Sequence, residues 1–477
     1  MGIVTSTPHP IYLPPENMGN ITVRNLTITP LELTEAERLI TKPNSPGFFS
    51  KIFGSRNTTP EPPAPTSNGK ETIAGAALPP FSEFTTSIAA PDPHTKEQLR
   101  LTFISPGTNH RYIATFPGTT PQSLVMRHES PDPTTREYTV IYLPRASYLT
   151  ILSSASLARW MAELPSTLPI SSLSIPGTHN SPTHHTALPS VRCQAVSVRT
   201  QLDNGVRFLD IRVSCPEESQ NDTDLALVHS AFPISLSGNK WFHDLLSDVY
   251  AYLDDNPSET VLISVKREGT GKGSDQTLSK ILAKRYVTDR WNISPRIPEL
   301  QETRGKVVLV RRFNLDESIK ELGIDGSVWP DNCADGTCGG GLIRIQDFYE
   351  VTQTEQIETK IELARAQLER AGQQACVPAG MPGAMGIQSA LPIFINFLSA
   401  SNFFNASCWP DRIAAKINPE IIEYLCTGHG APGKGPGQLS IGDAGTGIVV
   451  IDWVGHNGDW DLVRCIVGWN ARLQLKQ

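Results

Sequence analysis

The sequence predicts an α/β protein, an irregular (β/α)8 barrel of the TIM type preceded by a small β-rich, sandwich-like domain. Strand-like and amphipathic helical segments alternate along residues 151–477, which is typical of a barrel with helical crossovers. Residues 1–150 instead contain short strand-like segments separated by Pro, Gly and Asn. The 477 residues accommodate both domains, since such a barrel needs about 250 residues.

The first 150 residues predict the β-rich domain. Residues 21–28 alternate apolar and polar side chains, as a half-buried strand does. Residues 99–104, 111–116, 123–128 and 137–143 repeat this pattern. The Pro-rich segment from Ser55 to Gly69 has too few apolar side chains to form a core, so we expect a disordered insert near residues 54–75.

Residues 151–477 provide the candidate barrel. Strands are expected at residues 173–175, 207–212, 226–229, 260–266, 306–312, 341–349, 392–398 and 447–454. Helices are expected at residues 239–255, 274–286, 354–371 and 411–425. The polar connection between residues 213 and 225 is too short for a crossover helix, so we expect the barrel to be irregular there.

Composition restricts the partners and the compartment of the protein. The formal net charge is −7 without a Lys/Arg-rich run, which argues against a nucleic-acid partner. No stretch approaches about 18 uninterrupted apolar residues, and the N-terminus lacks the apolar core of a signal peptide. We therefore expect a cytoplasmic protein whose eight cysteines are free thiols. Gly2 fits the N-myristoylation pattern, and one acyl chain gives only weak attachment to a membrane.

Polar side chains occur where the predicted barrel strands end. They are His179, Asp210, Arg212, His229, Lys266, Arg311 or Arg312, Asp347, Tyr349 and Asp452. The carboxyl ends of barrel strands meet on one face, where such barrels carry their chemistry. Two histidines beside an aspartate and an arginine are suited to acid–base attack on a phosphate ester. The pattern therefore predicts one shared catalytic site.

Six segments of the chain resemble the catalytic X domain of phosphatidylinositol-specific phospholipases C. They read Ile-Pro-Gly-Thr-His-Asn-Ser at 175–181, Phe-Leu-Asp-Ile-Arg at 208–212, Val-His at 228–229, Leu-Ile-Ser-Val-Lys-Arg-Glu at 262–268, Arg-Gly-Lys-Val-Val-Leu-Val-Arg-Arg at 304–312 and Gly-Ile-Val-Val-Ile-Asp at 447–452. The first three, in this order, are the specific ones. The resemblance covers residues 155–470, and the added N-terminal region is similar to that of fungal members.

The resemblance also bears on metal dependence. Asp210-Ile211-Arg212 is similar to the metal-independent bacterial type, in which a guanidinium lies where calcium-dependent members hold the ion. This implies that no metal or other cofactor is needed. Asn180 departs from that type, which usually has Asp there, so a calcium-dependent enzyme is the alternative.

The resemblance implies a substrate and a role for each catalytic residue. The substrate is phosphatidylinositol or a related inositol phospholipid at a membrane surface. His179 takes the proton from the inositol 2-hydroxyl, and Asp452 orients its ring. His229 protonates the departing diacylglycerol oxygen, and Asp210 holds His229 charged. Arg212 neutralises the phosphoryl oxygens.

Five further residues are expected to bind the substrate. They are Asn180, Lys266, Arg312, Asp347 and Tyr349, with Tyr349 stacking on the inositol ring. Simpler interpretations stay open, with Lys266 as part of a solvated charge cluster and Asp347 or Tyr349 as a strand cap. Strand alternation sends Arg311 and Arg312 to opposite faces without saying which one faces the site.

Two other functions fit the same barrel. One is a catalytically silent module that binds inositol lipids, and the other is a phosphodiesterase for glycerophosphodiesters or sphingomyelin. Retention of the acid–base residues argues against the first, and Arg212 argues against the magnesium site that the second needs. Aromatic residues within 401–409, together with Phe232, Trp241 and Phe242, are expected at the barrel rim against a membrane or the N-terminal domain.

Overall fold

The computed structural model describes residues 19–40, 66–118, 123–131, 135–218, 224–376, 391–431 and 442–476. The chain divides into two compact units, with the boundary between Ala155 and Ser156. Gly2 and residues 54–65 of the expected insert lie outside the described residues. Residues 66–75 belong to a strand, so the expected disorder is corrected for this part of the insert.

The N-terminal unit contains two five-stranded sheets, ordered β4-β1-β10-β9-β7 and β3-β2-β5-β6-β8. Their strands are β1 (Asn20–Asn25), β2 (Leu31–Ile40), β3 (Thr66–Leu78), β4 (Ser82–Ala89), β5 (Glu97–Ile104), β6 (Arg111–Pro117), β7 (Leu124–Val125), β8 (Arg127–His128), β9 (Thr139–Leu143) and β10 (Tyr148–Leu152). Ile21 and Ile151 from the first sheet share one buried core with Leu101 and Phe103 from the second. Two sheets around one apolar core form a β-sandwich.

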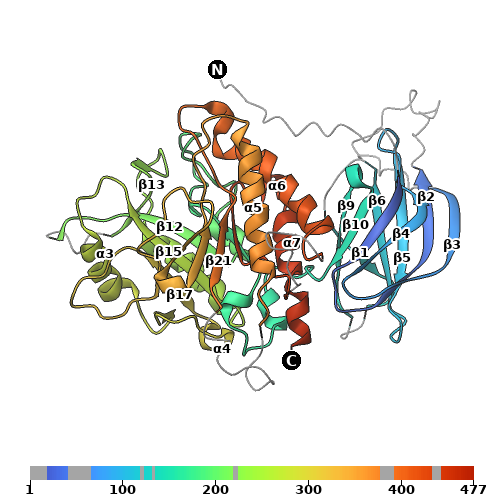
Figure 1. The fold of residues 1–477 in the computed structure, drawn as a ribbon, viewed down its shortest axis with the longest axis horizontal. Helices are drawn as coiled ribbons and strands as arrows, with labels where there is room; N and C mark the ends of the chain where they lie inside the picture. Colours follow the sequence, from blue (N-terminus) through green and yellow to red (C-terminus); the bar gives the residue numbers. More distant parts are fainter. Residues whose placement is uncertain are drawn as a thin grey trace, which may run out of the picture. The chain divides into compact units, whose positions relative to one another are not determined.

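The second unit is built on one curled, mainly parallel sheet (Figure 1). Its main strands are β11 (Ile175–Thr178), β12 (Phe208–Ser214), β15 (Val261–Glu268), β17 (Val307–Arg312), β20 (Ile343–Gln346), β21 (Ile393–Phe397) and β22 (Ile448–Ile451). Short strands are β13 (Ala226–His229), β14 (Phe232–Pro233), β16 (Trp291–Asn292), β18 (Ile324–Asp325) and β19 (Gly336–Cys338). The main strands pair in the order β17-β15-β12-β11-β22-β21-β20.

Helices connect most of these strands. They are α1 (Val198–Asp203), α2 (Phe242–Asp255), α3 (Asp275–Ile281), α4 (Leu300–Thr303), α5 (Gln356–Gly372), α6 (Pro410–Thr427) and α7 (Asp461–Gly468). Side-chain caps fix two of the starts, because Ser197 accepts from the N–H of Thr200 and Ser274 from that of Thr277. Within the described ranges, no helix is both long and apolar enough to cross a membrane.

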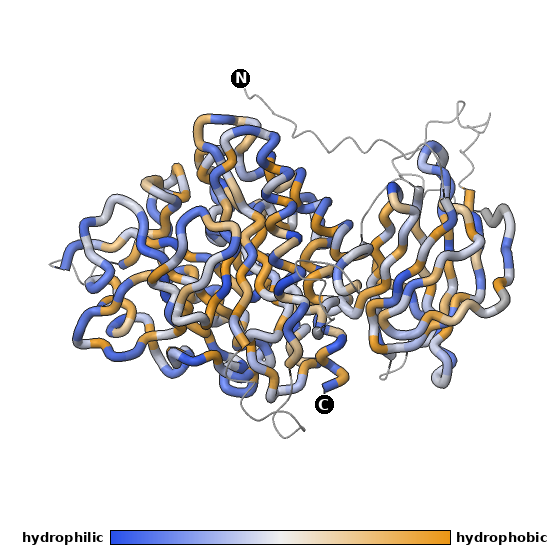
Figure 2. Tube along the Cα trace, in the orientation of Figure 1, coloured by the Kyte–Doolittle hydropathy of each residue, from blue (hydrophilic) through white to orange (hydrophobic). Residues whose placement is uncertain are grey.

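Burial on both faces explains why the central strands read as continuous apolar runs. Residues 261–265 of β15 and 307–310 of β17 are fully buried. Helices α2 and α3 add Val249 and Leu278 to the same core. Hydrophobic residues accordingly concentrate along the central strands (Figure 2).

The sheet is a curled half barrel rather than the closed ring of eight strands that we expected. β13 pairs antiparallel with β12, and β12 pairs parallel with β15, so β13 is not a barrel strand. The short connection after Ser214 permits a hairpin but not a parallel crossover. The connection from β17 to β20 contains no α-helix, and no pairing in the described part of the chain joins β17 or β18 to β19 or β20.

Candidate active site

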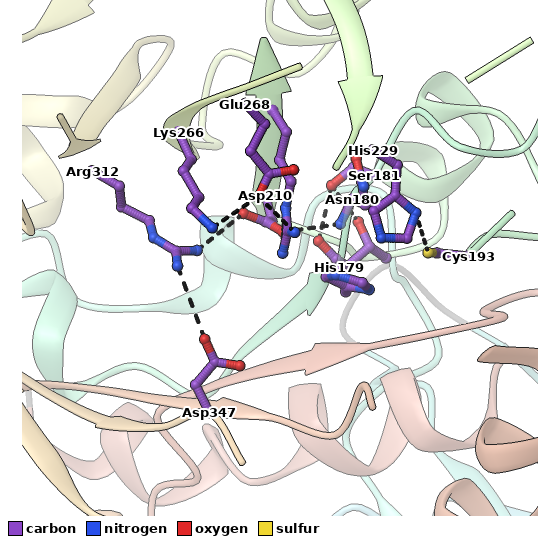
Figure 3. Close-up of polar contacts among 12 residues, drawn as sticks. His179, Asn180, Ser181, Cys193, Asp210, His229, Lys266, Glu268, Arg312 and Asp347 are labelled. Atoms are coloured by element: carbon purple, nitrogen blue, oxygen red, sulfur yellow. Dashed lines mark hydrogen bonds and ion pairs between the residues drawn. The ribbon is translucent and has the colours of Figure 1, made fainter. Parts of the chain in front are cut away.

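The carboxyl ends of the parallel strands bring the predicted polar residues to one edge of the sheet (Figure 3). His179 directly follows β11, and Asp452 directly follows the neighbouring β22. Asp210 and Arg212 lie on β12. His229 ends β13, the antiparallel strand that runs back along β12. Most of the expected site is therefore assembled from strands far apart in sequence.

His179 and Asp452 form a buried hydrogen-bonded pair. The distance from His179 Nδ1 to Asp452 Oδ1 is 2.9 Å. Gln194 holds the two strand ends together, because its amide donates to the carbonyl oxygens of His179 at 2.7 Å and Ile451 at 2.9 Å. Burial, followed by the positive charge of Arg212, lowers the pKa of His179 well below its ordinary value. The imidazole is therefore neutral near pH 7 and can accept a proton at Nε2.

His229 lies beside His179 but has a different partner. The two ring centroids are 5.6 Å apart and the rings are nearly perpendicular, at 86°. His229 Nδ1 lies 2.8 Å from the carbonyl oxygen of Val191 and 3.7 Å from Cys193 Sγ. Burial and then Arg212 lower the pKa of His229. The expected contact between Asp210 and His229 is replaced by the Val191 carbonyl.

Asp210 instead anchors the arginines. Its Oδ2 accepts from Arg212 Nε at 3.2 Å, from Arg212 Nη2 at 3.1 Å and from the N–H of Asn180 at 3.1 Å. Its Oδ1 accepts from Arg312 at 3.5 Å. Burial opposes ionisation, but Arg212 and Arg312 together lower the pKa of Asp210. The carboxylate is therefore charged and balances the two guanidinium groups.

Glu268 belongs to the site although the sequence analysis did not select it. Arg212 Nη1 donates to Glu268 Oε1 at 3.0 Å, so the guanidinium lies between two carboxylates. Lys266 donates to the same oxygen at 2.8 Å. Burial opposes ionisation, but Arg212 and Lys266 lower the pKa of Glu268 to about 2. Its position two residues after Lys266 on β15 was the available signal, since residues i and i+2 share a face.

Arg312, not Arg311, faces the site. Arg312 lies 3.9 Å from Asp347, and its guanidinium carbon is 3.8 Å from the centroid of the Trp329 ring. Trp329 also donates to Asp347 at 3.0 Å, a role that the sequence did not reveal. Arg311 pairs with Asp325 at 2.7 Å instead. Burial raises the pKa of Asp347, whereas the pKa values of Asp210 and Glu268 are lowered.

Tyr349 has its contacts outside this cluster. Its hydroxyl donates to Asp331 at 2.8 Å, and its N–H donates to the side chain of Asn332 at 2.9 Å. Neither partner belongs to the charged cluster around Arg212. The geometry therefore does not bring Tyr349 together with the other expected binding residues.

Asn180 presents a side-chain amide that nothing in the described part of the structure satisfies. Both Nδ2 and Oδ1 are buried without a hydrogen-bond partner. A buried amide left unpaired is costly, which indicates a site prepared for a polar ligand.

A left-handed residue follows each of the three central side chains. The φ angles are +43° at Asn180, +51° at Ser230 and +60° at Trp453. Non-glycine residues seldom adopt this conformation. It turns the chain away directly after each strand end, so the preceding side chain is held at the edge of the sheet.

An exposed aromatic patch lies near the strand ends. Phe232 on β14 stacks on Phe403 in the loop after β21, with centroids 5.4 Å apart and an interplanar angle of 7°. Phe404 is 94% exposed, and Leu236 is 69% exposed. Phe242 was expected at this rim but is fully buried in the core instead, because it begins α2 with its ring inward. We call Phe232, Leu236, Phe403 and Phe404 the aromatic patch.

The fold and the site define an α/β half-barrel protein whose site contains two histidines and an arginine. Residues 166–313 match the family described as "Phosphatidylinositol-specific phospholipase C, X domain". The similarity to bacterial proteins described as phosphatidylinositol phosphodiesterases extends over about two thirds of the chain.

Individual relatives show how far the similarity extends. The "1-phosphatidylinositol phosphodiesterase" of Staphylococcus aureus strain Newman is 25% identical over 335 residues, which cover 66% of this chain and 95% of that protein. The Listeria monocytogenes protein of the same description is 30% identical over 171 residues, 34% of this chain, and the match spans half of that relative's length. A solved structure of the S. aureus enzyme superimposes with a TM-score of 0.52 at 23% identity, covering 66% of this chain and 98% of that one. This structural likeness concerns the fold.

Proposed function

We propose that the protein cleaves phosphatidylinositol, or a closely related inositol phospholipid, into diacylglycerol and a cyclic inositol phosphate. The observation that carries this proposal is the nearly perpendicular histidine pair beside the half-buried Arg212. Each ring is oriented through Nδ1, by Asp452 in one case and by the Val191 carbonyl in the other. The match of residues 166–313 to the phosphatidylinositol-specific phospholipase C family supports the same reaction class.

His179 is the proposed general base. Its Nδ1 is occupied by Asp452, so Nε2 is the atom that accepts the proton from the inositol 2-hydroxyl. The 2-hydroxyl oxygen then attacks the phosphorus and closes a five-membered ring, which avoids the entropic cost of capturing water. Asp452 stabilises the imidazolium that forms.

His229 is the proposed general acid. The free protein holds it neutral, since burial and Arg212 lower its pKa. A bound phosphodiester adds a negative charge next to the ring and raises that pKa, so the imidazole takes up a proton as substrate binds. The Val191 carbonyl fixes the proton on Nδ1, which leaves Nε2–H to protonate the diacylglycerol oxygen as its bond to phosphorus breaks.

Arg212 is the proposed electrostatic stabiliser of the phosphoryl oxygens. Asp210 and Glu268 hold its guanidinium from two sides, so little reorganisation is needed as charge develops. A calcium ion bound by the same two carboxylates would be repelled by the positive charge of this guanidinium. That arrangement favours a metal-independent reaction over the calcium-dependent alternative.

Lys266, Arg312 and Asp347 are the proposed contacts for the inositol hydroxyls. Lys266 pairs with Glu268, and Arg312 pairs with Asp210 and Asp347, so these charged side chains lie beside Arg212. The unpaired Asn180 amide supplies one donor and one acceptor for the 2-hydroxyl or a phosphoryl oxygen. Tyr349 is the weakest of the proposed contacts because its hydroxyl is engaged by Asp331.

The aromatic patch is the proposed contact with the membrane. Large exposed aromatic side chains settle at the headgroup level of a bilayer, and a patch near the strand ends would bring the pocket to the lipid. Its residues come from two loops, after β13 and after β21, that the Phe232–Phe403 stacking holds together.

Phosphorus NMR of the full-length protein with phosphatidylinositol vesicles, with and without excess EGTA, tests the proposal. We expect a cyclic inositol phosphate signal in both samples, and its loss in H179A and H229A. H243A is the matched control, since His243 is an exposed histidine paired with Asp224 and Asp244. Activity lost in EGTA would establish the calcium-dependent alternative. Vesicle binding without any product would establish the silent binding module.

A further inference from the structure

The histidine pair has a third neighbour that the proposed reaction does not use, the thiol of Cys193. This residue lies in the loop between β11 and α1 and is fully buried. The loop is anchored next to the pocket, because the N–H of Trp453 donates to the Cys193 carbonyl at 2.7 Å. One ligand atom from each of His179, Cys193 and His229 lies within 4.8 Å of the other two (Figure 3).

The contact of His179 is that of a metal-binding histidine. A ligating histidine normally gives its other ring nitrogen to a carboxylate or a backbone carbonyl. His179 contacts the Asp452 carboxylate in this way, whereas Nδ1 of His229 contacts both the Val191 carbonyl and, at 3.7 Å, the Cys193 sulfur. Both rings are therefore oriented without any ligand, and each presents a nitrogen to the same small volume as the Cys193 sulfur.

We propose that His179, Cys193 and His229 form a site for a soft divalent cation, Zn²⁺, inside the pocket. Two imidazoles and a thiolate are ligands that zinc prefers, whereas calcium and magnesium take oxygen ligands. Zn–S and Zn–N bonds of about 2.3 and 2.0 Å place tetrahedral ligand atoms about 3.5 Å apart, so separations of up to 4.8 Å shorten by at most about 1.3 Å. Three protein ligands leave the fourth position to water.

Binding of the cation is coupled to one proton. Zinc binds the thiolate form of a cysteine. When Zn²⁺ binds, the S–H bond breaks, the Zn–S bond forms and the proton passes to solvent.

Occupancy of this site inhibits the proposed lipid cleavage. The metal takes an imidazole lone pair from both His179 and His229, so neither ring is free to accept or return the reacting proton. This consequence rests on the proposed function, whereas the binding of zinc does not.

Cobalt titration of the full-length protein tests the site directly, since Co²⁺ reports thiolate ligation by a sulfur-to-cobalt charge-transfer band. We expect this band in the wild type, its displacement by Zn²⁺, and its loss in both C193A and C193S. Zinc affinity is expected to fall at least about tenfold in these two variants. C215A is the matched control, because Cys215 is another fully buried free thiol of the same unit, and it keeps the band.

Absence of the band in the wild type, or its persistence in both Cys193 variants, overturns the site. A second readout concerns inhibition: Zn²⁺ is expected to lower phosphatidylinositol cleavage at least about tenfold, with recovery in EDTA. A Cys193-dependent band without inhibition shows that the catalytic histidines are not ligands and also overturns the site. A protein that forms the band but cleaves no lipid supports the zinc site while the proposed function fails.

Discussion

The Nδ1 atom of His229 lies 2.8 Å from the backbone carbonyl of Val191, whereas Nδ1 of His179 lies 2.9 Å from the Asp452 carboxylate. The two histidines therefore differ in the charge behind them. A carboxylate stabilises the imidazolium of a base after it has taken a proton. A neutral carbonyl fixes the ring but stabilises its charged form much less, which suits an acid that has to give its proton away.

Asp210 therefore acts mainly on Arg212 and only weakly on His229. In D210N we expect kcat to fall about 100-fold, because the guanidinium loses a charged anchor. The acidic limb of the pH profile of kcat/KM is expected to move little, since Asp210 is only a minor contributor to the pKa of His229. A pH–rate series from both proteins is the measurement. A shift of the acidic limb by more than about one pH unit would show that Asp210 determines the pKa of His229.

Asp452 is predicted to contribute mainly to the chemical step. The D452N amide keeps the shape of the side chain but stabilises the wrong tautomer of His179, so we expect kcat to fall about 10³- to 10⁴-fold with little change in KM. Initial rates on phosphatidylinositol vesicles measure both constants. D254N is the control, because Asp254 is exposed and pairs with Arg290 at the surface. A loss below about tenfold would be incompatible with a His179–Asp452 base.

The sequence predicted the parts of the site that depend on strand ends. Nearly continuous apolar runs, such as residues 307–310 and residues 261–265 with their single serine, locate buried parallel strands, and polar residues at their ends must then meet at one edge. His179, Asp210 and Asp452 were found in this way. The same reasoning could have identified Glu268, because it lies two residues after Lys266 on one strand and therefore shares its face.

Other contacts of the site could not be predicted from the sequence pattern. The partner of His229 is a carbonyl oxygen, and every residue has one. Trp329 reaches Arg312 from the helix-free connection between β17 and β20, whose path no periodicity specifies. The short connection before β13 indicated an irregularity, but whether β13 would remain in the barrel depends on tertiary pairing with β12.

The aromatic patch gives a prediction that separates membrane binding from chemistry. F404S removes a side chain that is 94% exposed, so the free energy of unfolding is expected to change by less than about 0.5 kcal/mol. Vesicle binding measured by sedimentation is expected to weaken about tenfold, which corresponds to burial of one large apolar side chain at the interface. V125S is the control, since Val125 is also exposed but lies in the N-terminal sandwich. Equal vesicle binding of F404S and wild type would show that the aromatic patch does not contact the membrane.

Lys360 gives a prediction about stability. This lysine of α5 is fully buried and donates one hydrogen bond, to Gln346 at 2.9 Å. Burial lowers its pKa from 10.5 to about 7. Between these pH values the unfolded chain holds a proton that the folded chain has lost. The free energy of unfolding therefore increases with pH across this window, by at most about 1.4 kcal/mol per unit from this group.

In K360M this contribution disappears. We expect the variant to be more stable than the wild type at pH 7, and its free energy of unfolding to depend less on pH between 7 and 10. Urea unfolding at several pH values within this range is the measurement. K416M is the control, because Lys416 is exposed on α6 and its replacement leaves the pH dependence unchanged. The same slope for K360M and wild type would mean that Lys360 keeps its proton in the folded state, with its charge stabilised by Asp347 and Asp452 across the sheet.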